Sequence, residues 1–189
     1  MDKSAPDAGP TPDAELIEAM NLGHVEAFEE LYQRHRDWVF RLAYRFTGNE
    51  HDALDVLQET FTYFLKRTPK LNLWVKLTTF LYPAVKNIAL TLRRKRGRGG
   101  AADAVLDQVA APGDSPEQRS REGDLIGVLA ALPQAHREVL LMRFVDGMSL
   151  EEIAESLQIP MGTVKSRLHN AIAKLREDRR TRAYFQIWT

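Results

Sequence analysis

Apolar residues recur three and four positions apart along most of this chain, and this spacing constrains its fold more than any other feature. Between residues 25 and 46 the pattern consists of Val25, Phe28, Leu31, Tyr32, Trp38, Leu42 and Phe46. No alternating apolar and polar run of useful strand length accompanies it. The sequence therefore predicts an all-α fold.

Glycine, proline and capping residues divide the first half of the chain into separate helices. We expect these helices at residues 12–20, 25–46, 51–67 and 76–96. Thr11 followed by Pro12 has the pattern of an N-cap with proline at the first helical position. Pro83 lies inside the last of these segments, and it predicts a kink or a new helix start there.

The composition changes after residue 96. Glycine, alanine and proline are frequent at residues 97–114, which predicts a flexible linker. The stretch from Ser115 to Gln118 is a capping box that restarts a helix. The expected organisation is two small helical domains on either side of the linker. The parts are a disordered lead at 1–11, a domain at 12–96, the linker at 97–114, a domain at 115–180 and an aromatic-rich tail at 181–189.

Charge is also arranged in blocks, although the formal net charge is zero. Residues 13–62 hold eleven acidic and four basic residues, whereas residues 63–102 hold ten basic residues and no acidic one. Residues 103–162 are again acidic, with eleven acids against four bases, and residues 163–182 hold seven bases against two acids. Two separated basic blocks suggest two contacts with a polyanion, and the acidic blocks suggest a different partner.

Several classes of protein are excluded or disfavoured by what the sequence lacks. The chain has no cysteine, which excludes disulfides, thiolate metal sites and thiol catalysis. Its five histidines show no i,i+4 pairing, and it has no catalytic triad motif or phosphate-binding loop, so we expect no enzyme activity, metal or cofactor. No apolar run approaches a membrane span of about 20 residues, and the first twelve residues lack the apolar core of a signal peptide. We expect a soluble cytoplasmic protein.

Residues 149–177 have the pattern of a helix-turn-helix. Ser149 and Glu152 form a capping box at the start of a short acidic helix, which stops near Ile159 and Pro160. We expect Gly162 to allow a sharp turn and Thr163 to cap the second helix. That helix buries Val164, Leu168, Ala171, Ile172 and Leu175, which leaves Ser166, His169, Asn170 and Ala173 outward. Short polar side chains at base edges, flanked by bases that contact phosphates, are suited to reading a DNA major groove.

Residues 132–177 closely resemble region 4 of bacterial RNA polymerase sigma factors, most strongly in "EIA", "GTVKSRL" and the final "LR". Response regulators of the LuxR type carry a similar helix-turn-helix, so the preceding domain has to decide between the two families. Region 4 reads the −35 promoter element. The residues that we expect at this contact, from the outward face of the helix and its margins, are Lys165, Ser166, Arg167, His169, Asn170 and Lys174.

Residues 26–67 resemble sigma region 2.1–2.2, which carries an acidic "DAxDxxQExF" segment. In this chain the segment reads "DALDVLQETF", and in the family this helix binds the clamp helices of the largest polymerase subunit. The core-binding residues implied by the resemblance are Asp52, Asp55, Gln58 and Glu59. The three acids lie three and four positions apart, so we expect them on one face.

Residues 69–98 then correspond to regions 2.3 and 2.4, which capture the melted −10 element. Opening a duplex requires a basic surface and a pocket or stacking platform for an unstacked base. Trp74, Phe80 and Tyr82 are the aromatic candidates, and Phe80 is expected to belong to the core rather than the platform. The resemblance places the base pocket in the loop at about 68–76. The residues that we expect to contact the −10 strand are Trp74, Lys76, Lys86, Asn87, Arg93 and Arg94.

Because the resemblance includes no region 1.1, region 1.2 or full region 3, it places the chain with the small extracytoplasmic-function (ECF) group of sigma factors. The implied function is promoter-specific initiation with core RNA polymerase, through its clamp helices and flap, on DNA that is double-stranded at −35 and single-stranded at −10. An anti-sigma factor is a further partner that the resemblance implies. The alternative is a free-standing helix-turn-helix regulator that binds duplex DNA without polymerase. Departures from the family pattern at Leu54, Pro83, Thr91, Asn170 and Ile172 leave the promoter sequence open.

Overall fold

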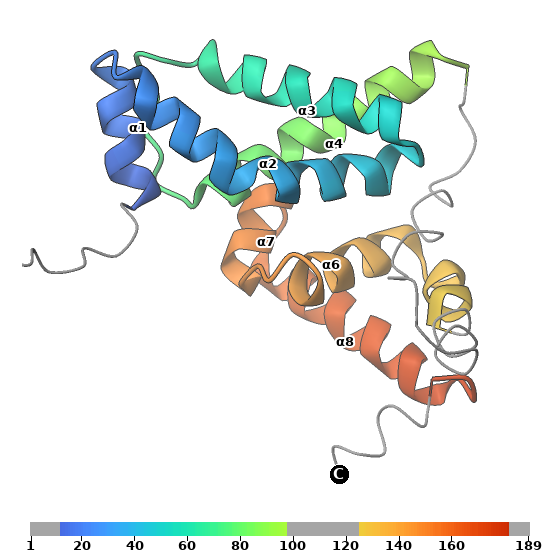
Figure 1. Cartoon of the computed structure of the whole chain (residues 1–189). Helices are drawn as coiled ribbons and strands as arrows, with labels where there is room; N and C mark the ends of the chain where they lie inside the picture. Colours follow the sequence, from blue (N-terminus) through green and yellow to red (C-terminus); the bar gives the residue numbers. More distant parts are fainter. Residues whose placement is uncertain (1–11, 98–124, 182–189) are drawn as a thin grey trace, which may run out of the picture.

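The computed structural model describes residues 12–97 and 125–181, and all regular elements in these ranges are helices (Figure 1). The N-terminal bundle comprises α1 (Asp13–Asn21), α2 (Val25–Thr47), α3 (Glu50–Leu65) and α4 (Leu77–Lys95). The C-terminal unit comprises a helical segment at 125–131, α6 (Gln134–Phe144), α7 (Leu150–Leu157) and α8 (Met161–Glu177). The predicted all-α class is confirmed.

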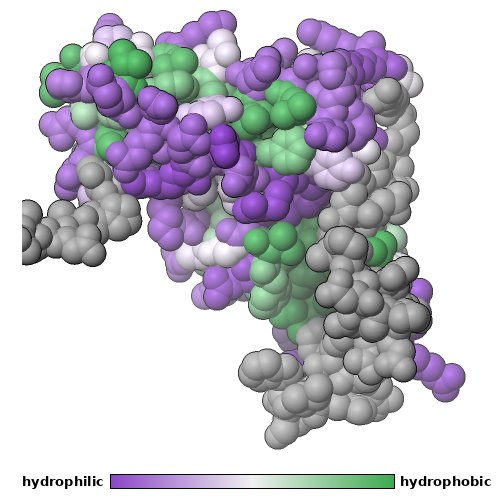
Figure 2. All heavy atoms as spheres, in the orientation of Figure 1, coloured by the Kyte–Doolittle hydropathy of each residue, from purple (hydrophilic) through white to green (hydrophobic). Residues whose placement is uncertain are grey.

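The N-terminal bundle is built from three long helices around an aliphatic and aromatic core. Fully buried side chains of α2, α3 and α4 meet there, among them Leu31, Val56, Phe64 and Leu81. The outward surface of this bundle is mainly hydrophilic in the view of Figure 2. One expected core residue, Val25, is 73% exposed, because it is the first residue of α2 and lies at the corner where α1 turns into α2.

Helix α2 ends and α3 begins at Gly48 and Asn49, as the sequence predicts. Gly48 adopts a left-handed conformation, with φ of 78°, and donates its N–H to the Tyr44 carbonyl, which ends α2. The side chain of Asn49 then accepts a hydrogen bond of 2.8 Å from the N–H of Asp52 and caps α3. Helix α1 begins differently from expectation, because Pro12 itself occupies the N-cap position and the helix starts at Asp13.

Helix α4 runs as one element from Leu77 to Lys95 with Pro83 inside it. Of the two alternatives expected at Pro83, a kink or a new helix start, the new start does not occur. Proline lacks the N–H that would bond the carbonyl four residues earlier, which is that of Thr79. This carbonyl accepts a hydrogen bond from the C-terminal unit instead. The interruption in the helical ladder is therefore satisfied by a second part of the molecule.

The helix-turn-helix is present, with a different turn from the one we expected. Ser149 and Glu152 make both bonds of the capping box, at 3.1 and 2.7 Å, and α7 follows for eight residues. The left-handed residue after α7 is Gln158, with φ of 54°, rather than a glycine. Gly162 lies within α8, where its missing side chain is not used for a turn. The expectations for Gly162 and Thr163 are therefore wrong, since Pro160 is the N-cap residue of α8.

Some expectations concern residues outside the described ranges. These are the lead at 1–11 with Thr11, the linker beyond Gly97, the capping box at 115–118 and the tail beyond Thr181. Within the ranges that are described, no helix combines the length and apolar character needed to cross a lipid bilayer.

The two units touch each other through α4 and α7 (Figure 1). A single cluster of buried apolar residues contains side chains of α1 to α4 together with Val139, Met142, Met148, Ile153 and Val164 of the C-terminal unit. A second, smaller cluster lies wholly within the C-terminal unit, among residues 125–132, α6 and α8. The larger core therefore continues from one unit into the other.

Candidate nucleic-acid and polymerase interfaces

The outward face of α8 carries the residues expected to read the −35 element. Lys165, Ser166, His169 and Asn170 are all exposed, and they lie within the first three turns of the helix. The opposite face is fixed in the core by Val164, Ala171 and Leu175, which are buried. Arg167 is half-buried at the margin, and Lys174 is exposed with its ammonium 3.7 Å from Glu177. The side chains that are expected to meet base edges and phosphates thus lie on one accessible surface.

The loop between α3 and α4, expected to hold the unstacked −10 base, is fastened to the end of α1. The side-chain amide of Asn21 donates to the Leu71 carbonyl at 2.6 Å, and its oxygen accepts the Leu71 N–H at 3.3 Å. Two bonds from one amide fix both backbone groups of Leu71. Sequence reasoning missed Asn21, because an asparagine near a helix end has the ordinary appearance of a cap.

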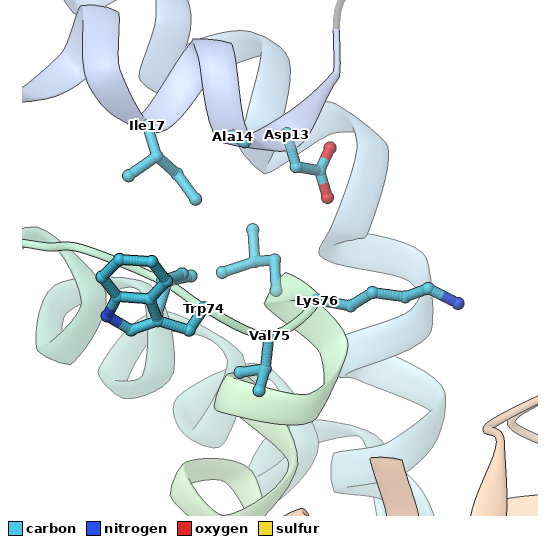
Figure 3. Close-up of a pocket in the computed structure, with 8 residues that line it drawn as sticks. Asp13, Ala14, Ile17, Trp74, Val75 and Lys76 are labelled. Atoms are coloured by element: carbon cyan, nitrogen blue, oxygen red, sulfur yellow. The ribbon is translucent and has the colours of Figure 1, made fainter. Parts of the chain in front are cut away.

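A pocket of about 400 Å³ opens between α1 and this loop (Figure 3). Asp13, Ala14 and Ile17 of α1 form one wall, and residues 73–77 form the wall that faces it. A second pocket of about 530 Å³ lies between α1 and residues 69–73 of the same loop. Figure 3 shows Trp74 and Val75 at the rim, while the Lys76 side chain extends away from the pocket. Both pockets therefore lie where the loop faces α1, and each has room for a nucleobase.

The three aromatic candidates occupy different environments. Trp74 is 90% exposed, so its ring is available for stacking. Phe80 packs its ring against Tyr63 and Phe64, with centroids 6.0 and 6.4 Å apart, as a partly buried residue of the core. Tyr82 is 1% exposed and donates its hydroxyl to Glu138 at 3.1 Å, so in this conformation it is not accessible to a base.

The other residues that are expected at the −10 strand also differ in their exposure and in their partners. Arg94 and Asn87 are exposed on α4. Arg93 is buried, and its guanidinium donates to the Phe46 carbonyl at 3.1 Å, which makes it part of the bundle's interior. Lys86 forms an ion pair with Glu138, and Lys76 pairs with Glu152 at 2.8 Å. Both acids belong to the C-terminal unit.

Burial also separates the residues that are expected to bind polymerase. Asp55, Gln58 and Glu59 lie on the accessible face of α3, with Asp55 half-buried and the other two exposed. Asp52 is fully buried and pairs with Arg96 at the end of α4, so the structure does not present its carboxylate on that face. Arg96 also pairs with Asp55 at 2.8 Å. This bridge was missed, because α3 and α4 are separated by a loop that hides their pairing in the sequence.

Burial and pairing shift the pKa of several groups between the two units. Burial raises the pKa of Tyr82 well above its ordinary value, and the nearby Glu138 carboxylate raises it further. Burial also raises the pKa of Asp146, against the opposing effect of Arg45, whose guanidinium lies 2.5 Å away. Burial raises the pKa of Glu152, but the hydrogen bonds from Lys76 and from the Ser149 backbone outweigh it, so the net shift is downward. Tyr82 therefore remains a protonated hydrogen-bond donor over the ordinary pH range.

Comparison with known proteins finds a matching family model for each half of the chain. A family model described as "Sigma-70 region 2" matches residues 31–99, and one described as "Sigma-70, region 4" matches residues 128–177. The chain is 34% identical over 178 residues to the ECF RNA polymerase sigma factor SigE of Mycolicibacterium smegmatis, covering 91% of this chain and 69% of that protein. It is 30% identical over 177 residues to SigW of Bacillus subtilis, covering 87% of this chain and 95% of that protein.

Among solved structures, the chain is similar to CnrH in complex with the cytosolic domain of CnrY. The TM-score is 0.64 at 22% identity, and the alignment covers 94% of this chain and 99% of that one. At this identity the likeness concerns the fold.

Proposed function

Because this chain belongs to the ECF family of RNA polymerase sigma factors, we propose that it binds core polymerase and reads a promoter at two places. In this proposal α8 reads the −35 element in the major groove, and the loop between α3 and α4 captures the melted −10 strand. The protein catalyses no reaction itself and works in the cytoplasm with the polymerase. The single observation that supports this two-site function best is that one chain exposes polar and basic residues of α8 on one unit and Trp74, Asn87 and Arg94 on the other.

Strand capture is proposed to centre on Trp74 and the pocket of about 400 Å³ beside it. An unstacked base needs an aromatic face and a recess to enter, and Trp74 lies beside such a recess where the loop meets α1. Asn21 holds this loop through two hydrogen bonds, so the pocket exists before DNA arrives. Asn87 and Arg94 on α4 are the accessible residues proposed to hold the strand's polar groups.

Polymerase binding is proposed to use the accessible face of α3, with Asp55, Gln58 and Glu59 toward the clamp helices of the largest subunit. Leu54 is 42% exposed on the same helix, so an apolar contact accompanies the charged ones. Asp52 supports this face from inside, because its bond to Arg96 ties α3 to α4. The C-terminal unit is proposed to meet the polymerase flap. An anti-sigma factor is a further proposed partner; the similar CnrH binds the cytosolic domain of CnrY.

In vitro transcription with purified core polymerase, followed by mapping of transcript starts, tests the proposal directly. We expect discrete starts that depend on this protein, and a pull-down should recover core polymerase with the wild-type chain but less with Glu59→Arg. Tight binding to duplex DNA without any association with core polymerase would instead favour a free-standing regulator. The relatives found do not favour that alternative.

A further inference from the structure

Ser166 lies on the outward face of α8, and its hydroxyl group is already engaged by the helix itself. The Ser166 Oγ donates to the Thr163 carbonyl at 3.0 Å, three residues earlier in the same helix. The Ser166 side chain is exposed, whereas Val164 is fully buried and fixes the rotation of α8 about its axis. Ser166 therefore presents its oxygen to the surroundings while its one hydrogen is in use.

This bond restricts what the Ser166 side chain can offer a ligand. A hydroxyl group has one hydrogen to donate and two lone pairs that accept. Because the hydrogen is directed at the Thr163 carbonyl, the lone pairs are the part of the group that faces outward. To donate outward, the hydroxyl would have to rotate and give up its bond within the helix, which is worth roughly two- to tenfold in an equilibrium constant. The fold thus favours Ser166 as a hydrogen-bond acceptor.

The space beside this oxygen is open to an approaching base edge. Helical side chains lean toward the N-terminus, so the Ser166 hydroxyl lies over the turn that contains Gly162. Gly162 is exposed, and a Cβ added to it would meet no other atom within 4 Å. Its φ is not positive, so the backbone conformation does not require a glycine there. The preceding turn of α8 therefore places no side chain over the Ser166 oxygen.

The other exposed groups on this face of α8 differ from Ser166 in their hydrogen-bonding roles. Lys165 and Lys174 only donate, and the amide of Asn170 both donates and accepts. A neutral imidazole at His169 also has one donor and one acceptor. Among these exposed residues, Ser166 is the one that the fold restricts to acceptance.

Base edges in the major groove differ in the property that such an acceptor can read. Adenine N6 and cytosine N4 are amines that donate, whereas guanine O6 and thymine O4 accept. Each base pair carries one such amine, so an acceptor distinguishes which strand holds it. Facing O6 or O4, the lone pairs of Ser166 would meet other lone pairs without a hydrogen between them.

We propose that Ser166 selects an exocyclic amine within the −35 element, so that the base it faces is adenine or cytosine rather than guanine or thymine. The inference rests on the −35 role of α8 proposed above, and it names the base chemistry at one position of that element. Asn170 lies four residues further along α8, about 6 Å at 1.5 Å per residue, and therefore reaches a different base pair.

The first test uses holoenzyme and promoters found by mapping of transcript starts. Competitor duplexes that carry every single substitution in the −35 region are compared for wild type and Ser166→Ala. This variant should fold, because it removes an exposed hydroxyl and alanine favours the helix. We expect its profile to be flat at one position, where wild type prefers adenine or cytosine on one strand by about three- to tenfold.

The second test removes the amine from the DNA at that position. Purine in place of adenine, or 2-pyrimidinone in place of cytosine, keeps the ring and lacks the exocyclic amine. We expect wild type to bind the analogue duplex about three- to tenfold more weakly, and Ser166→Ala to bind both duplexes alike. Asn170→Ala is the matched control, because it keeps the Ser166 oxygen and should lose as much affinity as wild type.

A preference for guanine or thymine at the position that depends on Ser166 would overturn the inference. A profile that Ser166→Ala leaves unchanged, or an equal loss for Ser166→Ala on the analogue duplex, would do the same. In these cases the −35 role of α8 still stands if Asn170→Ala or Lys174→Ala weakens promoter binding. If wild-type holoenzyme is indifferent to every substitution in the −35 region, that role fails, and the inference fails with it.

Discussion

At the scale of single residues, burial separates side chains that the sequence presents as equivalent. Trp74 and Tyr82 are both aromatic residues in the basic block, yet one is 90% and the other 1% exposed. Arg93 and Arg94 are neighbours, yet Arg93 is buried against the Phe46 carbonyl while Arg94 is exposed. Helical periodicity indicates which face of α4 turns inward, but it does not reveal that a second unit covers part of the other face.

Trp74→Ala should abolish much of the strand capture while leaving the fold intact. Stacking of a base on an aromatic ring is worth about 1–3 kcal/mol, so open-complex formation should fall by roughly 5- to 150-fold. The unfolding free energy should change by only about 0.5 kcal/mol, because the ring is almost wholly exposed. Open-complex formation can be followed by permanganate reactivity of the promoter. Phe80→Ala is the contrasting variant, which should lower stability, and a normal open complex with Trp74→Ala would refute the stacking role.

Asn170→Ala should reduce discrimination at one base pair of the −35 element. The exposed amide of Asn170 can bond a base edge in two places, and loss of such a contact costs about 1–3 kcal/mol at the matching base pair. Lys174→Ala is the control, because a phosphate contact should weaken all sequences alike. The measurement is binding to a series of single-substituted duplexes. A preference profile that keeps its shape in Asn170→Ala would show that this amide does not read a base.

At the scale of helices, the sequence predicts well which segments are helical, and it predicts less well where each helix begins and ends. The ends at Gly48 with Asn49 and at Ser149 with Glu152 could be predicted, because these residues are local capping signals. The α7–α8 turn was not, because Gln158 adopts the left-handed conformation although glycine is the usual residue there. The sequence does not decide between a kink and a new helix start at Pro83, since the bond that compensates for this proline comes from residue 156. Local sequence cannot show a partner so distant along the chain.

The capping box of α7 should make stability depend on pH below the ordinary glutamate pKa of 4.5. Burial raises the pKa of Glu152, but hydrogen bonds from Lys76 and the Ser149 backbone outweigh it and lower the net value. A carboxylate with a lowered folded-state pKa contributes stability that is present above its unfolded value and lost as pH falls through the folded one. Glu152→Gln should therefore flatten the unfolding free energy below pH 4.5 relative to wild type. Parallel curves for the two proteins, measured by urea unfolding, would contradict this account.

At the scale of the whole molecule, the division into two units is clearer in the sequence than in the packing. Two helical domains were expected on either side of a linker, and both regions are matched separately by family models. The larger apolar core nevertheless includes Val139, Ile153 and Val164 together with residues of the N-terminal bundle. Contacts between units depend on complementary surfaces rather than on periodicity, so they cannot be predicted from the helical pattern.

Removing one partner of the buried ion pair between Arg45 and Asp146 should cost more stability than removing both. Burial raises the pKa of Asp146 despite the nearby guanidinium, which means that desolvation offsets much of the attraction between the charges. Its folded-state pKa lies above the ordinary value of 3.8, so this carboxyl favours folding most below pH 3.8, and that contribution is lost as pH rises through the folded value.

Asp146→Ala at neutral pH should lower the unfolding free energy by about 3–5 kcal/mol, because it leaves the Arg45 charge buried without its carboxylate. Arg45→Met combined with Asp146→Ala should recover most of this loss, since a methionine fills the space of the arginine stem without a charge. Urea unfolding of wild type and both variants measures the difference, with Arg94→Met as the control for removing an exposed cation. If the double variant is as unstable as the single one, attraction between the two charges, rather than relief of an unpaired buried charge, accounts for the loss.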